Sequence, residues 1–348
     1  DTSAGIRNDR GRVESGWQGM RSVSLPATGV RRRSTAGGSG AGLVGWQAAF
    51  LAVGIPGLLL AFWVATLREP VRGASEGIAA PVSPSPFTDF LRELIAVIPP
   101  FTLFGAMQRG PKALAINLGF AAFVASAAWW LSRVTGNAPQ WIAVAIGFYA
   151  VFSWALSLRA RDFPTFKLIW GTPAFLQVTM AYGFLLFISY STNFWGAPYA
   201  ERVLGQTKTV IGLWIGGGSV AGGLFGVILG GRLADHFRRS NPAGRILVML
   251  SGTTGIILPM IIAYTTTSPF VFYIMYALMS VLFSGTLGAA AATTQDLVLP
   301  RMRGTATATF MLSQALLGLA LGPYMAGYVS GVTGSLRIGV LSVLVAAP

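Results

Sequence analysis

Residues 209–239 read TVIGLWIGGGSVAGGLFGVILGGRLADHFRR, a long apolar stretch that ends in a basic cluster. The apolar part, residues 209–230, is long enough to cross a bilayer as a helix, which takes about 20 residues. In the polar part Asp235 stands close to Arg238 and Arg239, and we expect residues 231–239 to form a short turn at the membrane edge. This pattern predicts an integral membrane protein.

Four glycines in this stretch recur at every fourth position, so that on a helix they share one face. They are Gly218, Gly222, Gly226 and Gly230. A glycine face lets a second helix approach closely. The competing interpretation, a phosphate-binding loop, fails because no strand precedes the glycines and no Gly-Lys-Ser/Thr follows. We therefore predict helix packing, and predict it again at Gly318 and Gly322, which Pro323 follows.

The composition of the whole chain agrees with a membrane location. Of its 348 residues 53% are hydrophobic and 10% are charged, whereas a soluble domain carries about 25% charged residues. The net charge of +14 would suit nucleic acid, but the Lys and Arg residues lie in loops between apolar runs. We predict a lipid bilayer and no nucleic acid as partner. With no cysteine and one histidine, His236, no metal site or cofactor is predicted.

Eight apolar segments have the length of a transmembrane helix, and a ninth is shorter. They are residues 46–67, 113–131, 140–158, 172–195, 209–230, 245–265, 269–292 and 305–328, followed by 337–347. The predicted fold is an all-α polytopic membrane protein with about eight full transmembrane helices and a truncated ninth. If the end of the first segment is cytoplasmic, most Lys and Arg residues fall in cytoplasmic loops, as the positive-inside rule requires.

Residues 1–44 are polar and rich in Gly, Ser and Arg, which predicts a disordered tail. Their arginines would lie on the wrong side of the membrane for the positive-inside rule. Either this tail is not native to its position or further helices precede residue 45, and both alternatives suggest a missing N-terminal half.

Polar side chains inside apolar segments are costly and often functional. We select Gln314, Tyr182, Tyr190, Asn193 and Tyr276 as candidates for a substrate cavity. The alternative places each tyrosine in an interfacial belt and Asn193 in water. No acidic residue falls in the middle of a predicted span, so no proton relay of the usual kind is expected. No nucleophile–His–acid set is present either, and we predict that the chain is not an enzyme.

A second turn, residues 295–304, combines acidic and basic residues on the same predicted side. Together the two turns predict a latch on the cytoplasmic face. Its candidate residues are Gly231, Asp235, Arg238, Arg239, Asp296 and Arg303. The alternative is a pair of positive-inside loops that each contain one stray acid.

Several short motifs occur in an order and spacing that resemble the C-terminal half of a major facilitator superfamily transporter, most closely its spinster-like branch. They are GWQAAF (45–50), GIPGLL (54–59), LREP (67–70), NFWGAP (193–198), GGRLAD (230–235), PRMRGTA (300–306) and Gly322-Pro323. The chain departs from the family pattern at His236 and Arg238, where the family usually has a basic residue and a glycine. This difference puts the strength of the latch in doubt.

The resemblance implies a domain order: a tail (1–44), the last helix of an N-terminal bundle (45–67), a cytoplasmic linker (68–112), an inserted helix pair (113–158) and a truncated C-terminal bundle (159–348). It further implies a secondary transporter that works by alternating access, in a bacterial inner membrane, with a missing N-terminal bundle as partner. The carboxylate-free cavity favours small organic or amphipathic, lipid-like substrates. Two alternatives stay open: transport of small organic anions, and a non-transporting or defective membrane fragment.

Overall fold

The computed structural model describes part of the chain: residues 45–68, positions 84, 85, 87, 88, 90, 91, 94 and 98, and residues 101–347. The chain divides into two compact units, Asp1–Val71 and Arg72–Pro348. The predicted tail, residues 1–44, lies outside the described residues, as does most of the predicted linker before residue 101.

In the first unit the structure describes one helix, α1 (Gly45–Ala65), at the position of the predicted span 46–67. Its apolar stretch Phe50–Ala65 is shorter than the membrane-crossing helices of the second unit. The helix ends where the Thr66 hydroxyl donates a hydrogen bond of 2.6 Å to the Trp63 carbonyl oxygen.

Within the described residues, seven helices of the second unit are long and apolar enough to cross a membrane. They are α4 (Pro111–Thr135), α5 (Ala138–Arg161), α7 (Pro173–Arg202), Lys208–Ser240, Gly244–Thr265, α12 (Pro269–Asp296) and Pro300–Thr333. Each covers one of the predicted spans, apart from Thr172 at the start of the span 172–195, and the predicted all-α membrane fold is confirmed. The final apolar segment forms α15 (Leu336–Ser342) and the 3₁₀ turn η5 (Val343–Ala346).

Three of these helices change geometry along their length. Lys208–Ser240 consists of α8 (Lys208–Ile211), the π-helical η2 (Gly212–Gly216) and α9 (Gly217–Ser240). Gly244–Thr265 consists of α10 (Gly244–Gly255) and α11 (Ile257–Thr265). Pro300–Thr333 consists of the 3₁₀ turn η3 (Pro300–Met302), α13 (Arg303–Ser313), the π-helical η4 (Gln314–Leu321) and α14 (Gly322–Thr333).

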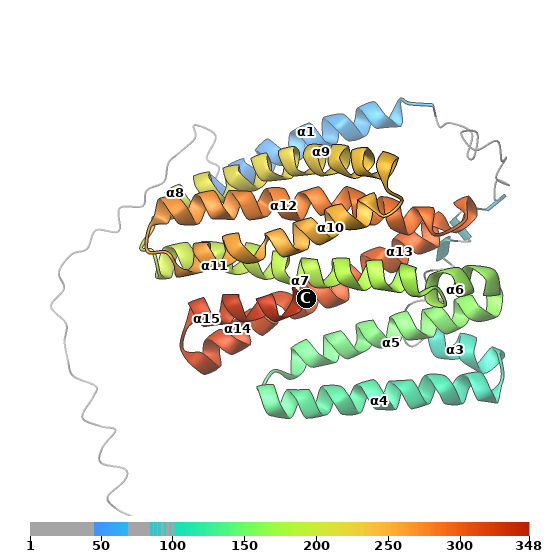
Figure 1. Cartoon of the computed structure of the whole chain (residues 1–348). Helices are drawn as coiled ribbons and strands as arrows, with labels where there is room; N and C mark the ends of the chain where they lie inside the picture. The colour runs from blue at the N-terminus through green and yellow to red at the C-terminus, as the bar shows by residue number, and fades with distance from the viewer. Residues whose placement is uncertain are drawn as a thin grey trace, which may run out of the picture. The chain divides into compact units, whose positions relative to one another are not determined.

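The predicted inserted pair forms an antiparallel hairpin of α4 and α5, which lie side by side (Figure 1). Gly136 ends α4 in the left-handed conformation (φ 72°), which glycine adopts without steric cost. Asn137 then caps α5, because its side-chain oxygen accepts a hydrogen bond of 3.3 Å from the Gln140 backbone N–H. Pro139 follows at the start of α5, where its missing N–H removes no helical hydrogen bond. The tight turn is therefore encoded locally.

Two short helices lie at the other end of this hairpin. They are α3 (Phe101–Gln108), before α4, and α6 (Phe163–Trp170), after α5. Asp162 caps α6: its carboxylate accepts hydrogen bonds from the Thr165 backbone N–H (3.1 Å) and from the Thr165 hydroxyl (2.5 Å). These hydrogen bonds hold the pKa of Asp162 below its ordinary value, with a smaller contribution from the charge of Arg301.

The glycine face of α9 packs against α12 (Figure 1). A Cβ atom added at Gly222 would lie 2.6 Å from the Ser280 Cβ atom, and one added at Gly218 would lie 3.4 Å from the Ala277 Cβ atom. At Gly226 and Gly230 an added Cβ would collide with backbone atoms of α12. Gly226 and Gly230 thus allow direct backbone contact between the two helices, and Gly222 makes room for the Ser280 side chain.

The predicted turn at residues 231–239 is wrong, because this run is helical and forms the last turns of α9. It contains no proline and no glycine after Gly231, so nothing in it interrupts the helix. The helix ends at Ser240, since Asn241 precedes a proline and adopts an extended conformation (φ −142°, ψ 124°). The Asn241 side chain accepts a hydrogen bond of 2.9 Å from the Ala243 N–H, which closes the actual turn.

An aromatic cluster fills the core between α7, α11 and α12. Tyr199, Tyr264 and Phe272 are fully buried, and the rings of Tyr199 and Tyr264 meet edge to face at 4.7 Å. The Tyr199 hydroxyl donates a hydrogen bond of 2.9 Å to the Tyr264 carbonyl oxygen. Because this core fixes α7 against α12, it positions the polar residues of both helices.

Candidate functional site

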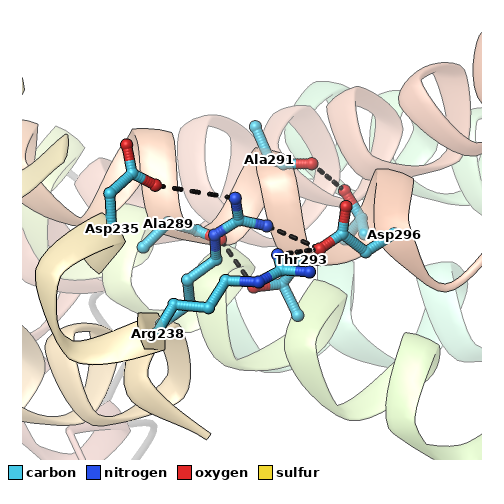
Figure 2. Close-up of polar contacts among 8 residues, drawn as sticks. Asp235, Arg238, Ala289, Ala291, Thr293 and Asp296 are labelled. Carbon is cyan, nitrogen blue, oxygen red and sulfur yellow. Dashed lines mark hydrogen bonds and ion pairs between the residues drawn. The ribbon is translucent and has the colours of Figure 1, made fainter. Parts of the chain in front are cut away.

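Two acids and two arginines meet where α9, α10 and α12 end or begin (Figure 2). Asp296, the last residue of α12, accepts hydrogen bonds from Arg238 on α9 and, at 2.6 Å, from Arg245 on α10. A second Arg245 nitrogen lies 3.6 Å from a carboxylate oxygen of Asp235. We call Asp235, Arg238, Arg245 and Asp296 the helix-end ion cluster. It brings together three of the predicted latch residues.

Arg245 is the most buried side chain of the helix-end ion cluster, at 18% exposed, and joins both acids. It was not selected as a latch residue from the sequence. The neighbouring Gly244 places it there: a Cβ added at Gly244 would collide with the backbone of Phe237 and Arg238, so only glycine lets α10 begin against the end of α9. A basic residue directly after a helix-breaking Asn-Pro and a glycine is the signal that could have identified it.

The other three predicted latch residues lie outside this cluster. Gly231 lies within α9 in open space, and the Arg239 side chain is exposed near the end of that helix. Arg303 begins α13, after the turn at η3. Of the predicted latch residues, the two acids, Asp235 and Asp296, thus both contact Arg245, whereas Arg239 and Arg303 lie elsewhere.

Three of the predicted cavity residues lie on α7 and on the helix formed by α13 and η4, which pack together. Tyr182 is buried, and its ring stacks on Phe310 at 5.0 Å. Tyr190 is half-buried, and a Cβ added at Gly318 would lie 3.2 Å from its ring. Gly322 contacts the same helix, because an added Cβ would collide with the Phe187 carbonyl oxygen. The predicted packing residues on η4 and α14 thus lie against α7.

Gln314 begins the π-helical segment η4 and is buried, with 9% of its surface exposed. Its side-chain nitrogen is buried and has no hydrogen-bond partner among the described residues. An amide left unsatisfied in this way costs about 1–3 kcal/mol. A π-helical segment widens the helix and occurs often at functional sites. The sequence identified the residue, but it held no signal for the π-helical geometry.

The remaining two cavity candidates form a separate pair between α7 and α12. The Tyr276 hydroxyl donates a hydrogen bond of 3.1 Å to the Asn193 side-chain oxygen. The Asn193 nitrogen donates one of 2.8 Å to the Ser189 carbonyl oxygen. Tyr276 is buried, whereas Asn193 is exposed. The five candidates thus divide between two helix interfaces and do not line one common wall.

Comparison with known proteins shows to which family the chain is similar. The sequence profile described as "Major Facilitator Superfamily" matches residues 33–323. The chain is 27% identical over 158 residues to an "MFS-type efflux pump" of Mycolicibacterium smegmatis, covering 45% of this chain and 37% of that protein. It is 26% identical over 181 residues to "Protein spinster homolog 1" of Xenopus tropicalis, covering 48% of this chain and 34% of that protein. The match thus spans about a third of each relative.

Among solved structures, the chain is similar to the crystal structure of a bacterial homologue of the human lysosomal transporter Spinster, in an inward-facing and unoccupied conformation. The sequences are 20% identical, the superposition covers 66% of this chain and 62% of that one, and the TM-score is 0.48.

Proposed function

The chain belongs to the Major Facilitator Superfamily, and from this premise we propose that it forms part of a secondary transporter that moves small organic or amphipathic, lipid-like molecules by alternating access. The match is to a transporter family, in agreement with the prediction that the chain is not an enzyme. The similarity to spinster homologues supports a role in this family. One relative is a bacterial efflux pump, which supports a bacterial inner membrane as the location.

The observation that carries this proposal is the unpartnered Gln314 amide inside a membrane-spanning helix. Polar side chains within membrane-spanning helices are retained where they contact a substrate or another polar group. The acids of residues 101–347 (Asp162, Glu201, Asp235 and Asp296) stand at or near helix ends. A substrate at Gln314 would therefore meet a hydrogen-bonding amide away from these carboxylates. This environment suits an amphipathic molecule.

The helix-end ion cluster supports the movement part of the proposal. It ties together the ends of three helices through Arg245, so these helices can turn as one body when the substrate site opens to one side or the other. Alternating access also needs a second bundle. We propose that the N-terminal bundle predicted from the resemblance supplies it.

The test is uptake into vesicles that contain the purified full chain, together with any N-terminal bundle its gene encodes. Lysolipids and small organic anions are compared as substrates. We expect saturable transport of lysolipids, reduced at least tenfold in the Gln314→Leu variant. Gln177→Leu is the matched control, because it makes the same change at an exposed position of α7. A saturable preference for small anions would favour the alternative substrate class, and no transport above protein-free vesicles would contradict the proposal.

The same Gln314→Leu variant should be more stable than the wild type, because it removes an unsatisfied buried amide worth about 1–3 kcal/mol. A variant that folds better and transports less separates a substrate-binding role from a structural one. Loss of both stability and transport would indicate that Gln314 is structural.

A further inference from the structure

The α4–α5 hairpin encloses a cavity of about 440 Å³ together with α6, α7, α13 and η4. We call it the apolar cavity. Its lining includes Phe120, Phe152, Leu156, Phe166, Trp170 and Leu312. Two hydroxyls in its wall are bonded: Thr309 donates to the Thr305 carbonyl oxygen (3.0 Å) and Ser313 to that of Thr179 (3.1 Å). The Thr179 hydroxyl and the Trp170 indole N–H, also in the wall, have no hydrogen-bond partner among the described residues. Most of the wall is hydrocarbon, which an acyl chain can contact.

One residue of the apolar cavity reaches the surface of the molecule. Met180 lies in its lining, and 42% of that side chain is exposed on the surface of a membrane-spanning helix. Its volume falls in the range of roughly 300–1,000 Å³ that small-molecule sites occupy. Acyl chains are the hydrocarbon that surrounds a transmembrane helix, so they are its most abundant occupant.

A second cavity, of about 450 Å³, lies at the end of the hairpin where α4 begins and α5 ends. We call it the basic pocket, because Arg109, Lys112 and Arg159 line it and none of the described residues in its lining is acidic. The loop-charge pattern predicts that this end faces the cytoplasm. The cytoplasmic leaflet is where anionic lipids attract basic residues near the membrane surface.

Arg109 has a guanidinium nitrogen that could donate a hydrogen bond to an anion. Its Nε donates a hydrogen bond of 3.0 Å to the Gly105 carbonyl oxygen, but its Nη1 is buried with no hydrogen-bond partner in the described part of the chain. Burial, and then the charge of Arg161, lower the pKa of this guanidinium. An arginine nevertheless stays protonated in proteins. A buried, charged donor without an acceptor is costly, and an anionic oxygen would satisfy it.

The two cavities adjoin at Leu156. Leu156 lines both of them, and Arg159 follows it on α5 after about one helical turn. An anionic group in the basic pocket and a hydrocarbon chain in the apolar cavity can therefore belong to one molecule. We propose that an anionic phospholipid binds here, with its phosphate at Arg109, Lys112 and Arg159 and one acyl chain in the apolar cavity. Gln314 lines neither cavity, so this site is independent of the proposed substrate.

Native mass spectrometry of the detergent-solubilised full chain tests this site. Phosphatidylglycerol and phosphatidylcholine with identical acyl chains are added separately. We expect phosphatidylglycerol to bind more tightly than phosphatidylcholine. The double variant R109Q/R159Q should bind phosphatidylglycerol about 30-fold more weakly, because each basic residue near the membrane surface raises the affinity about five- to sixfold. R232Q/R239Q is the matched control: it removes two exposed charges from α9, on the same side, and should leave binding unchanged. Equal binding of both lipids, or an equal effect of both double variants, would overturn the proposal.

The acyl-chain half of the proposal needs its own variant. Leu312→Trp fills the apolar cavity and should abolish binding of phosphatidylglycerol. Leu258→Trp, at a position 66% exposed on α11, should leave that binding unchanged. Glycerol phosphate is added as a competitor without acyl chains. If glycerol phosphate displaces phosphatidylglycerol at equal concentration, the ligand is a free phosphate compound and the lipid assignment is wrong. Should Leu312→Trp fail to fold, the charge variants and this competition still decide the question.

Discussion

The closest approach of α9 to α12 gives the sharpest stability prediction. At Gly230 an added Cβ would collide with the backbone of Gly285, which cannot rotate away as a side chain can. At Gly223, seven residues earlier on the same helix, an added Cβ meets nothing within 4 Å. Replacing each glycine by alanine therefore makes one chemical change in two environments.

Both substitutions gain about 1 kcal/mol of helix propensity, since alanine loses less conformational freedom than glycine. Only Gly230→Ala also forces two helices apart, and such overpacking costs about 1–3 kcal/mol. The propensity gain cancels when the two variants are compared. We therefore expect Gly230→Ala to be less stable than Gly223→Ala by about 1–3 kcal/mol.

The assay is reversible unfolding of both variants and the wild type in mixed micelles, monitored by far-UV circular dichroism while a denaturing detergent is increased. Gly223→Ala should unfold at a detergent fraction equal to or above that of the wild type, and Gly230→Ala below Gly223→Ala. Equal midpoints for the two variants would refute the close backbone contact between α9 and α12.

Three further predictions concern polar contacts. Arg245→Gln should lower the unfolding free energy measurably at low salt, and by less at high salt, because its ion pairs are partly screened; an effect that does not vary with salt would contradict this. A double-mutant cycle of Tyr276→Phe and Asn193→Ala should give a coupling of about 0.6 kcal/mol, typical of hydrogen bonds between membrane helices, and zero coupling would exclude the bond. Thr165→Val should remove the hydrogen bond from its hydroxyl, the first cause of the lowered pKa of Asp162. The stability that the substitution costs should therefore be constant above about pH 5 and shrink as the pH falls and the carboxylate is protonated; a cost that stays the same at every acidic pH at which the protein is folded would contradict this.

The membrane-spanning helices could be predicted from hydropathy because lipid requires long, uninterrupted apolar helices. The seven long helices cover the predicted segments, apart from Thr172, and each has additional residues at one or both ends. The error at residues 231–239 has a physical cause: polarity marks where a helix leaves the membrane, but not where it stops being a helix. Asn241 and Pro242 carry the stop signal, and they lie beyond the basic cluster.

Individual residues of the candidate site could be predicted from the sequence, but their contacts with one another could not. Asp235, Arg238 and Asp296 could be selected by type, but Arg245 depends on the close approach that Gly244 allows between two helices. The cavity candidates Tyr190 and Asn193 share one helix, yet they meet different neighbours. Which neighbour each one meets follows from how α7 packs, and no single-helix pattern contains that information.

The loop between α9 and α10 has a consequence for where the chain accepts new sequence. Exposed polar turns ordinarily tolerate inserted residues, and Asn241, Pro242 and Ala243 are all exposed. Gly244 nevertheless fixes the register of the next helix against the last one, so even a single inserted residue would move Arg245 away from both acids. A tag or epitope inserted at Asn241 should therefore disrupt the helix-end ion cluster, and this exposed loop behaves in this respect as part of the core.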